Sequence, residues 1–505
     1  MRWTWIVLAI GLSTTVAACH RTPSAPQSSE TQTIAWREGD VADALAEAKE
    51  SGKPVLLYWG AKWCPPCNQL KSTLFKDPAF IAETQQFVPV YLDGDTTGAQ
   101  KWGERFGIRG YPTVIVLRAD GSEITRLSTG SRLPEVLRAA AGRTTSIDDL
   151  FAKAEKDPSS LSPDEWQILA AFDWQNDPRH DHAKAAAVLD RLAGAAPEGA
   201  VKRRFTLLAL SVGVQAGPDG KYALTPAQQT QIAQVLPTVL ANPAEVTANR
   251  LELSYWIPSL VAALPDAGQR TAIGASLIVA LDKVYGDDSL PLPDRLGTVN
   301  ADLTLDKAAN GHVSKALLTK VRDRAAWADG AAKDAMVRQS VISNAADLLH
   351  EAGDDAGAKK LLQAELKRSA EPYYYMLDLA SIAEDEHDGP AAITWARKAY
   401  DTSEGQATRV QWAIEYAKTV VRQAPGDKPA VEASAQAVID ELAKNSGGYY
   451  QRTRIKVDAL GDTLRDWSAA HNGGAVLARL DTAMAGVCAK QGDAAANCRT
   501  WAQGA

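Results

Sequence analysis

Hydrophobic and polar positions in residues 34–145 alternate between strand-like and helix-like patterns. Residues 55–59 form a near-continuous apolar run, which is typical of a central strand that is covered on both faces. The whole pattern predicts strands at 55–59, 87–93, 113–117 and 123–127, and helices at 40–51, 68–74, 99–106 and 133–141. The sequence therefore predicts an α/β domain, in which a mixed sheet carries helices on both faces.

From about residue 146 onward the strand patterns disappear and helical patterns dominate. Three predicted helices begin in the same way, with a Ser, Thr or Asn cap, Pro at the first helical position, and Glu or Gln three residues after the cap. These three starts are residues 162–165, 225–228 and 242–245. The remaining 360 or so residues are therefore expected to form a large all-α region.

A repeated pattern lies towards the C-terminus, where residues 353–362 are echoed by residues 387–399. Ala358 and Ala392 occupy corresponding places, and their spacing of 34 residues resembles the tetratricopeptide (TPR) period. Such helix pairs bury their apolar faces only against neighbouring pairs and so build a curved array. The alternative is an irregular helical domain in which the spacing is accidental.

The segment Trp63-Cys64-Pro65-Pro66-Cys67 lies between a predicted buried strand and a predicted helix. A thiolate at the first turn of a helix is stabilised by the helix dipole and by unpaired backbone N–H groups. This position predicts that Cys64 is an exposed nucleophile and that Cys67 resolves the mixed disulfide. Zinc sites also use paired cysteines at this spacing, but the preceding strand, the following helix and the Trp favour redox chemistry.

The first domain resembles the thioredoxin superfamily, and in particular the periplasmic branch that includes the C-terminal domain of the thiol:disulfide interchange proteins. Three stretches carry the resemblance: residues 53–67 with the Cys-x-x-Cys motif, residues 74–80 and residues 108–113. It covers about a fifth of the chain. The family implies that Pro112 is cis and lies beside the motif; the alternative is a simple Gly-x-Pro turn. Because a cis proline exposes the backbone of the preceding residue, we expect Tyr111 to pair with a substrate strand, and we expect Trp63 to pack over the cysteines.

Two departures from the family pattern concern proton transfer and thiolate stability. Thioredoxins usually bury an acid six residues before the first cysteine, but Tyr58 stands there and is a poor base at neutral pH. Pro65 and Pro66 lack N–H groups, so Cys64 depends largely on the Cys67 N–H and thiol. We therefore expect a Cys64 pKa that is only modestly lowered, which favours a reductant or an isomerase over a strong oxidant.

The N-terminus has the pattern of an export signal, with a basic start, an apolar core from Trp3 to Leu12 and small residues before Cys19. The ending resembles a bacterial lipobox, which implies lipidation of Cys19; ordinary cleavage after Ala18 or an uncleaved anchor are the alternatives. His20 after the cysteine favours the outer membrane over the inner one.

We expect a lipoprotein signal peptide at 1–18, a flexible tether at 19–33, a thioredoxin-like domain at 34–145, a helical domain at 146–335 and a TPR-like helical domain at 336–505.

The chain has five cysteines, and Cys488 and Cys498 remain after the lipidation site and the redox pair are assigned. In an exported protein these two are most simply a structural disulfide that closes a short C-terminal loop. A zinc site that uses four cysteines from both ends of the chain is the less favoured alternative. We expect no metal.

With 505 residues the chain is too long for one core, and two to four domains are expected. Its formal net charge of -7 gives no support for nucleic-acid binding, which requires a basic face.

We expect a periplasmic, lipid-anchored thiol–disulfide oxidoreductase that acts on protein thiols or disulfides, takes electrons from another redox protein, needs no cofactor and docks partners on its helices. The alternative is a scaffold or chaperone-like lipoprotein with little turnover.

Overall fold

The computed structural model describes residues 33–127, 133–143, 145–444, 449–492, 495–498 and 501. Its one sheet has the strand order β1-β3-β2-β4-β5, in which β1, β3 and β2 are parallel and β4 and β5 are antiparallel additions. The predicted mixed sheet is confirmed, and the sequence pattern missed only the short β1. The strands are β1 (Arg37–Glu38), β2 (Val55–Gly60), β3 (Val88–Asp93), β4 (Thr113–Leu117) and β5 (Glu123–Leu127).

Strand β2 is the middle strand, and all of its residues are buried. Val55, Leu57 and Trp59 pack against one helical layer, while Leu56 and Tyr58 pack against the other. This alternation explains the uninterrupted apolar run, because both faces of the strand are covered. The first layer holds α1 (Val41–Ser51) and α4 (Thr97–Phe106), and the second holds α2 (Pro65–Ser72), α3 (Pro78–Thr84) and α5 (Leu133–Ala141).

The apolar core of the second layer continues beyond residue 145 into the helical region. Leu127 of β5 forms an antiparallel bridge with Phe172, and the Asp173 N–H donates to the Arg126 carbonyl over 2.9 Å. The domain boundary that we expect near residue 145 therefore falls within a continuous core. The helices that share this core are α6 (Ile147–Lys156), α7 (Pro163–Ala171), α8 (His182–Ala195) and α9 (Ala200–Gly213).

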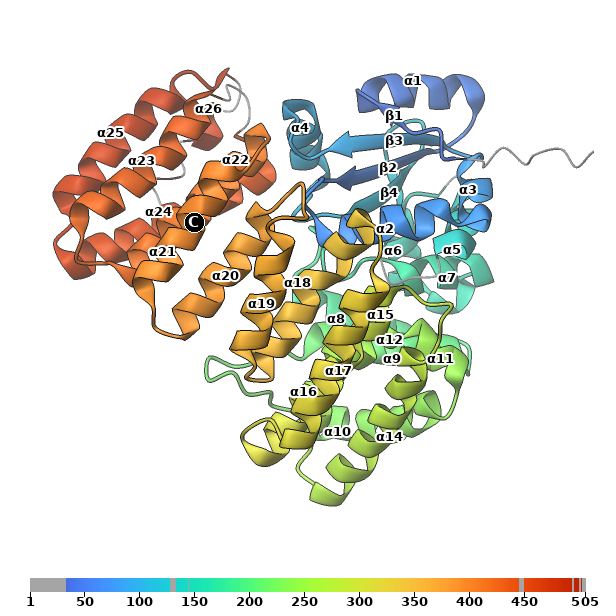
Figure 1. Cartoon of the computed structure of the whole chain (residues 1–505). Coiled ribbons are helices and arrows are strands. Elements are labelled where there is room, and N and C mark those ends of the chain that lie inside the picture. Colours follow the sequence, from blue (N-terminus) through green and yellow to red (C-terminus); the bar gives the residue numbers. More distant parts are fainter. Residues whose placement is uncertain are drawn as a thin grey trace, which may run out of the picture.

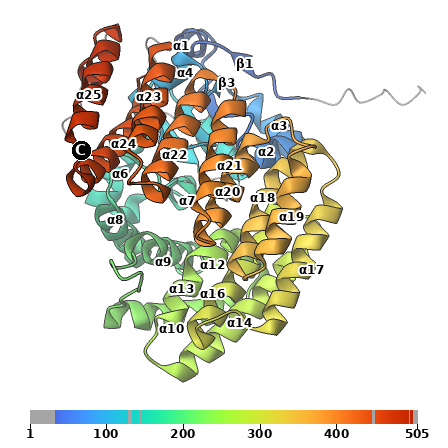
Figure 2. The same cartoon turned by 60° about the vertical axis from the view of Figure 1, so that its left-hand side comes forward.

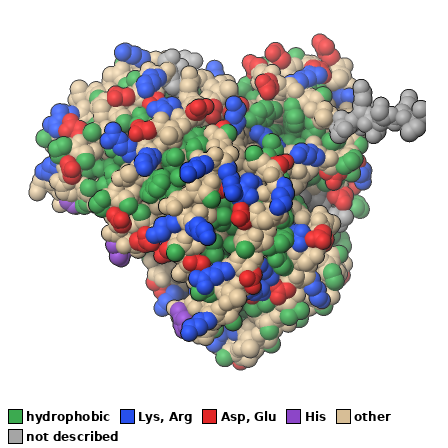
Figure 3. Space-filling model, in the orientation of Figure 1, with side chains coloured by type: hydrophobic (Ala, Val, Ile, Leu, Met, Phe, Trp, Pro, Cys, Tyr) green, Lys and Arg blue, Asp and Glu red, His purple; other side chains and the backbone are tan. Residues whose placement is uncertain are grey.

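The rest of the described chain is helical, as predicted, and curves around the sheet domain (Figures 1 and 2). Acidic and basic side chains are mixed on the face shown in Figure 3. The middle helices are α10 (Pro226–Leu240), α11 (Pro243–Ala248), α12 (Arg250–Tyr255), α13 (Ile257–Ala262), α14 (Ala267–Tyr285), α15 (Leu292–Gly297), α16 (Val299–Asn310) and α17 (Lys315–Ala331). The last are α18 (Ala335–Glu351), α19 (Asp355–Glu365), α20 (Tyr373–Asp385), α21 (Gly389–Thr402), α22 (Gln406–Gln423), α23 (Lys428–Lys444), α24 (Gln451–His471), α25 (Gly474–Cys488) and α26 (Ala495–Cys498).

The sequence repeat has a structural counterpart at the starts of α19 and α21. Asp354 and Asp388 are both N-caps whose side chains accept a backbone N–H three residues later. Ala358 and Ala392, at the corresponding places inside these helices, are both fully buried. The TPR-like assignment itself stays a prediction.

The cysteines at the C-terminus are joined: Cys488, at the end of α25, is bonded to Cys498 of α26, with Cα atoms 5.3 Å apart. Cys19 and the predicted signal peptide lie outside the described residues. Within the described ranges, no helix combines the length and the apolar character needed to cross a membrane.

Glu165, near the start of α7, makes the stability of the fold depend on pH. Burial alone would raise its pKa, but hydrogen bonds from Lys153, the Ser162 N–H and Arg143 outweigh burial and lower the pKa to about 2. The folded state therefore holds this proton less tightly than the unfolded chain, so the stabilisation is present above about pH 4.5 and is lost as the pH falls towards 2. At neutral pH it amounts to about 3 kcal/mol.

We predict that Glu165→Gln lowers the free energy of unfolding at pH 7 and removes this loss of stability between pH 4.5 and 2. Denaturant unfolding across that pH range measures both effects. Glu198→Gln is the matched control, because Glu198 is exposed and forms its ion pair with Lys202, four residues along the same stretch. If Glu165→Gln and wild type have parallel pH profiles, the buried ion pairs do not carry the stability assigned to them.

Candidate active site

The Cys-x-x-Cys motif lies between the end of β2 and the start of α2, where the sequence places it. Cys64 is the N-cap of α2 and is bonded to Cys67, with Cα atoms 5.2 Å apart. The Cys67 N–H donates to the Cys64 sulfur over 3.2 Å. Pro65 and Pro66 fill the first helical positions and offer no donor, so Cys67 supplies the first-turn N–H that reaches Cys64.

The segment before β4 carries the other residues that the family resemblance implicates. The Tyr111–Pro112 peptide bond is cis, as that resemblance implied. The Tyr111 hydroxyl accepts a hydrogen bond from the Gln100 side chain over 3.0 Å. Tyr111 packs against the apolar cluster that contains Trp63 and both cysteines of the motif. The structure therefore brings together residues separated by about fifty positions.

The helical region covers this site, so the expectation of an exposed Cys64 is wrong. Cys64 is 2% exposed, Cys67 is fully buried and Trp63 is 9% exposed. The Trp63 indole N–H donates to the Thr408 hydroxyl over 2.7 Å. Its ring meets Trp412 edge to face at a centroid distance of 4.9 Å. Helices more than 300 residues away in the sequence thus pack over the residue that precedes Cys64.

Further contacts hold the helical region against the loops around the motif. The Thr408 N–H donates to the Asp95 carboxylate over 2.7 Å. Burial raises the pKa of Asp95, although the hydrogen bonds from Thr408 act in the opposite direction. A second group of contacts involves α2, where the Asn68 side chain donates to Gln339 and the Gln69 side chain donates to Asp294, each over 2.8 Å. In Figures 1 and 2, α18 lies beside α2, and the two helices are in contact.

Tyr58 occupies the place of the acid that thioredoxins usually bury. Its hydroxyl is buried and has no hydrogen-bond partner within the described residues. Burial, and to a lesser extent Tyr91, raises the pKa of Tyr58 above its ordinary value. Tyr58 therefore stays protonated at neutral pH and does not serve as the base for Cys67.

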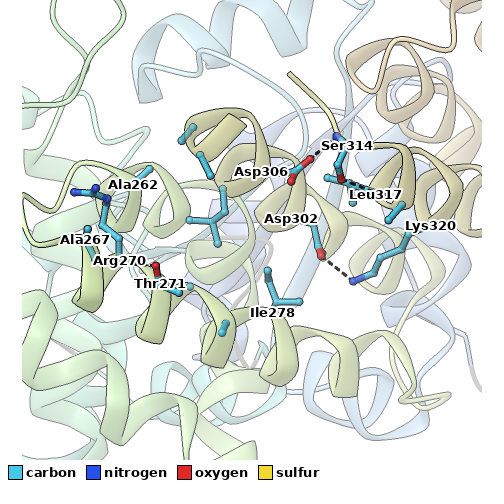
Figure 4. A pocket seen from close by; sticks show the side chains of 16 residues that line it. Ala262, Ala267, Arg270, Thr271, Ile278, Asp302, Asp306, Ser314, Leu317 and Lys320 are labelled. Atoms are coloured by element: carbon cyan, nitrogen blue, oxygen red, sulfur yellow. Dashed lines mark hydrogen bonds and ion pairs between the residues drawn. The ribbon is translucent and has the colours of Figure 1, made fainter. Parts of the chain in front are cut away.

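Two cavities border the motif, and a larger one lies elsewhere. Trp63 lines a cavity of about 400 Å³, and Pro65 and Pro66 line one of about 290 Å³. The larger cavity, of about 710 Å³, lies among α14, α16 and α17 (Figure 4). None of its lining residues belongs to the sheet domain. The two smaller cavities are therefore the ones that concern the redox pair.

Comparison with known proteins agrees with this geometry. Residues 41–143 match the family model described as "Thioredoxin-like domain". The thiol:disulfide interchange protein DsbD 1 of Pseudomonas aeruginosa is 32% identical over 107 residues, which are 20% of this chain and 18% of that protein. A thioredoxin H-type of Oryza sativa subsp. indica is 30% identical over 96 residues, 19% of this chain and 73% of that protein. Thioredoxin H4 of Arabidopsis thaliana is 29% identical over 119 residues, 23% of this chain and 94% of that protein.

The chain therefore belongs to the thioredoxin family, through residues 41–143. It spans less than a fifth of the length of the DsbD proteins that it matches. These matches cover the sheet domain, whereas Thr408, Trp412 and the other residues that close the site come from the helical region. No motif near Thr408 indicated this role, because a Trp at helical spacing is usually a packing residue.

We predict that Thr408→Val loosens the cover over the motif. Valine keeps the shape of threonine but leaves the buried Trp63 N–H without its acceptor, which costs about 1–3 kcal/mol. Alkylation of Cys64 by iodoacetamide, measured on pre-reduced protein by peptide mass analysis, should be roughly tenfold faster than in wild type. Thr402→Val is the matched control, because that exposed hydroxyl bonds only within the helical region. Equal alkylation rates for Thr408→Val and wild type would contradict this role of the hydrogen bond.

Proposed function

We propose that the chain is an exported, membrane-anchored thiol–disulfide oxidoreductase that reduces or isomerises disulfides of other proteins. The observation that carries this proposal is the bonded Cys64–Cys67 pair at the N-terminus of α2, in a domain of the thioredoxin family. The relatives named as thioredoxins and as thiol:disulfide interchange proteins support the same class of reaction.

The reaction uses the two cysteines in sequence. In the reduced protein the Cys64 thiolate attacks one sulfur of a substrate disulfide, a mixed disulfide forms, and the other substrate sulfur leaves as a thiolate. The Cys67 thiolate then attacks the Cys64 sulfur, releases the second substrate thiol and leaves the Cys64–Cys67 disulfide. The substrate gains two electrons and the protein loses two, so another redox protein must reduce the pair again.

The two prolines of the motif support a reductant or isomerase. A thiolate at Cys64 has the Cys67 N–H, but Pro65 and Pro66 provide no further first-turn donor. A less stabilised thiolate makes the reduced form less favoured, and strong oxidants owe their potential to a stabilised reduced form.

The proposed location rests on the N-terminal sequence. Lipidation of Cys19 after removal of residues 1–18 would anchor the protein, and residues 19–33 would tether it to the periplasmic face of the membrane. His20 favours the outer membrane. The helical region would dock the redox partners or the substrate proteins.

A second candidate is a scaffold or chaperone-like lipoprotein in which the thioredoxin fold is a docking module with little turnover. The burial of Cys64 and Cys67 favours this candidate, because a covered dithiol reacts slowly. The reaction with a disulfide substrate distinguishes the two candidates.

We predict that Cys67→Ser accumulates a mixed disulfide through Cys64, because no resolving thiol releases the substrate. Cys64→Ser should lower the rate of disulfide reduction by about a thousandfold or more, because a hydroxyl does not replace the attacking thiolate. Full-length protein, pre-reduced and mixed with a peptide disulfide, gives both results by non-reducing electrophoresis and mass analysis.

The double variant Cys488→Ala/Cys498→Ala is the control, because this pair is bonded far along the chain in α25 and α26 and should leave the reaction unchanged. Failure of Cys67→Ser to form any mixed disulfide, with the reduced protein correctly folded, would favour the scaffold function over the enzyme.

A further inference from the structure

The cavity of about 400 Å³ beside the motif is formed by both parts of the molecule. The sheet domain contributes Trp63, the residue next to Cys64, and helices α20, α22 and α24 contribute the other walls. Tyr374 and Trp412 line it together with Trp63, and their rings contact the Trp63 ring. One wall of the cavity is therefore aromatic and adjoins the redox pair.

Three basic and three acidic residues line this cavity, and two of the three basic residues are ion-paired with carboxylates of the lining. Arg422 pairs with Glu384 over 2.8 Å, and Lys456 lies 3.4 Å from Glu415. Arg452 also lines the cavity but has no carboxylate within ion-pair distance among the described residues. The carboxylates of Asp95 and Glu415 act on Arg452 only from beyond that distance.

Two shifts in pKa bear on the charge around Arg452. Asp378, another lining residue, donates no charge at neutral pH, because burial and the nearby Asp347 raise its pKa to about 8. Burial lowers the pKa of Arg452, which reports the cost of keeping a guanidinium out of water. Arg452 is half-buried and lacks a close carboxylate, so an anion that enters the cavity gains a favourable contact with it.

Arg452 is placed on the side of the motif that faces the cis-proline segment. Its guanidinium carbon lies 5.5 Å from the centre of the Trp63 ring and 4.8 Å from that of Tyr111. These two residues directly precede Cys64 and Pro112 in the sequence. The guanidinium also donates to the Gln411 side chain, which holds it in this place. Arg452 thus lies between the two side chains that flank the reacting groups.

We propose that this cavity is a substrate subsite and that Arg452 binds a carboxylate carried close to the reacting disulfide. This inference rests on the proposed oxidoreductase function and names its substrate class: a small disulfide or an extended peptide segment with an anionic group beside the sulfur. Cys64 is 2% exposed and does not line the cavity, so Trp63, which does line it, must move before a substrate sulfur in the cavity reaches Cys64.

The second cavity beside the motif has the opposite character. Besides Pro65 and Pro66 it is lined by Asp294 and Asp347, and no Lys or Arg lines it. Arg250 neutralises Asp294 from outside this lining, with nitrogen and oxygen 2.5 Å apart. A substrate that entered here would be neutral or cationic, so the charge of the preferred substrate identifies the cavity that is used.

The test uses three small disulfides with the same two-carbon spacer: anionic dithiodipropionate, neutral bis-hydroxyethyl disulfide and cationic cystamine. Pre-reduced full-length protein is mixed with each one, and formation of the Cys64–Cys67 disulfide is followed in a single turnover. Each rate is divided by that of free dithiothreitol with the same disulfide, which removes differences in intrinsic reactivity. The expected order is anionic, neutral, cationic, with a preference of roughly tenfold for the anion over the neutral compound.

Three variants assign the preference to Arg452. Arg452→Gln should abolish the preference for the anion over the neutral compound, and Arg452→Lys should keep most of it, because the charge remains. Arg422→Gln is the matched control at the edge of the same cavity: that residue is exposed and already paired, so the preference should persist. Two short peptide disulfides, with Glu or Lys beside each cysteine, then show whether the charge preference also holds for a peptide segment or only for a small molecule.

Equal normalised rates for the three disulfides would overturn the proposal, and a preference for cystamine would assign entry to the acidic cavity instead. A uniform slowing of all three in Arg452→Gln would also overturn it, because Arg452 would then act on the sulfur chemistry or the fold rather than on the charge of the substrate. Absence of reaction with every disulfide would refute the proposed enzymatic function itself, which is a different result from reaction without a charge preference.

Discussion

The contact between Trp63 and the helical region links the packing of the two parts of the molecule to the redox pair. The indole N–H bonds to Thr408, and the ring packs on Trp412. Leaving the buried indole N–H without an acceptor costs about 1–3 kcal/mol. The hydrogen bond to Thr408 therefore favours the arrangement in which the helical region covers Trp63. Since Trp63 is adjacent to Cys64, the same contact decides how much of the nucleophile is accessible. Stability of the interface and reactivity of the redox pair are therefore coupled.

Much of the sheet domain could be predicted from the sequence because its signals are local. The apolar run of β2 reports burial on both faces, the apolar spacing of Val41, Ala44 and Ala48 marks α1, and the Asp120-Gly121 turn separates β4 from β5. The two-residue β1 carries no comparable pattern, and it forms only because β3 offers a free edge. Helix starts in the α-region were equally clear, as the capping boxes at Ser162 and Thr225 show.

The candidate site could be predicted only in part, because only some of its residues are brought together by local structure. Residues that lie on one strand–helix junction, such as Cys64 and Cys67, are brought together by local structure, and the family resemblance adds Pro112. Thr408 and Arg452 reach the same place through the packing of whole helices, and no pattern in their own segments points to Trp63. Burial of Cys64 follows from that packing, which is why the expectation of an exposed nucleophile was wrong.

Cys64 and Cys67 act as a working dithiol despite their burial only if the pair can be reduced and oxidised reversibly. The reduction potential of this pair can be measured in the chain without residues 1–33, by equilibrating the protein with glutathione buffers and determining the ratio of thiol to disulfide at the two cysteines. We expect one reversible two-electron couple close to the thioredoxin range, at about -270 mV. A value towards -120 mV would contradict the argument from the two prolines, and the absence of a reversible couple would contradict the enzymatic function.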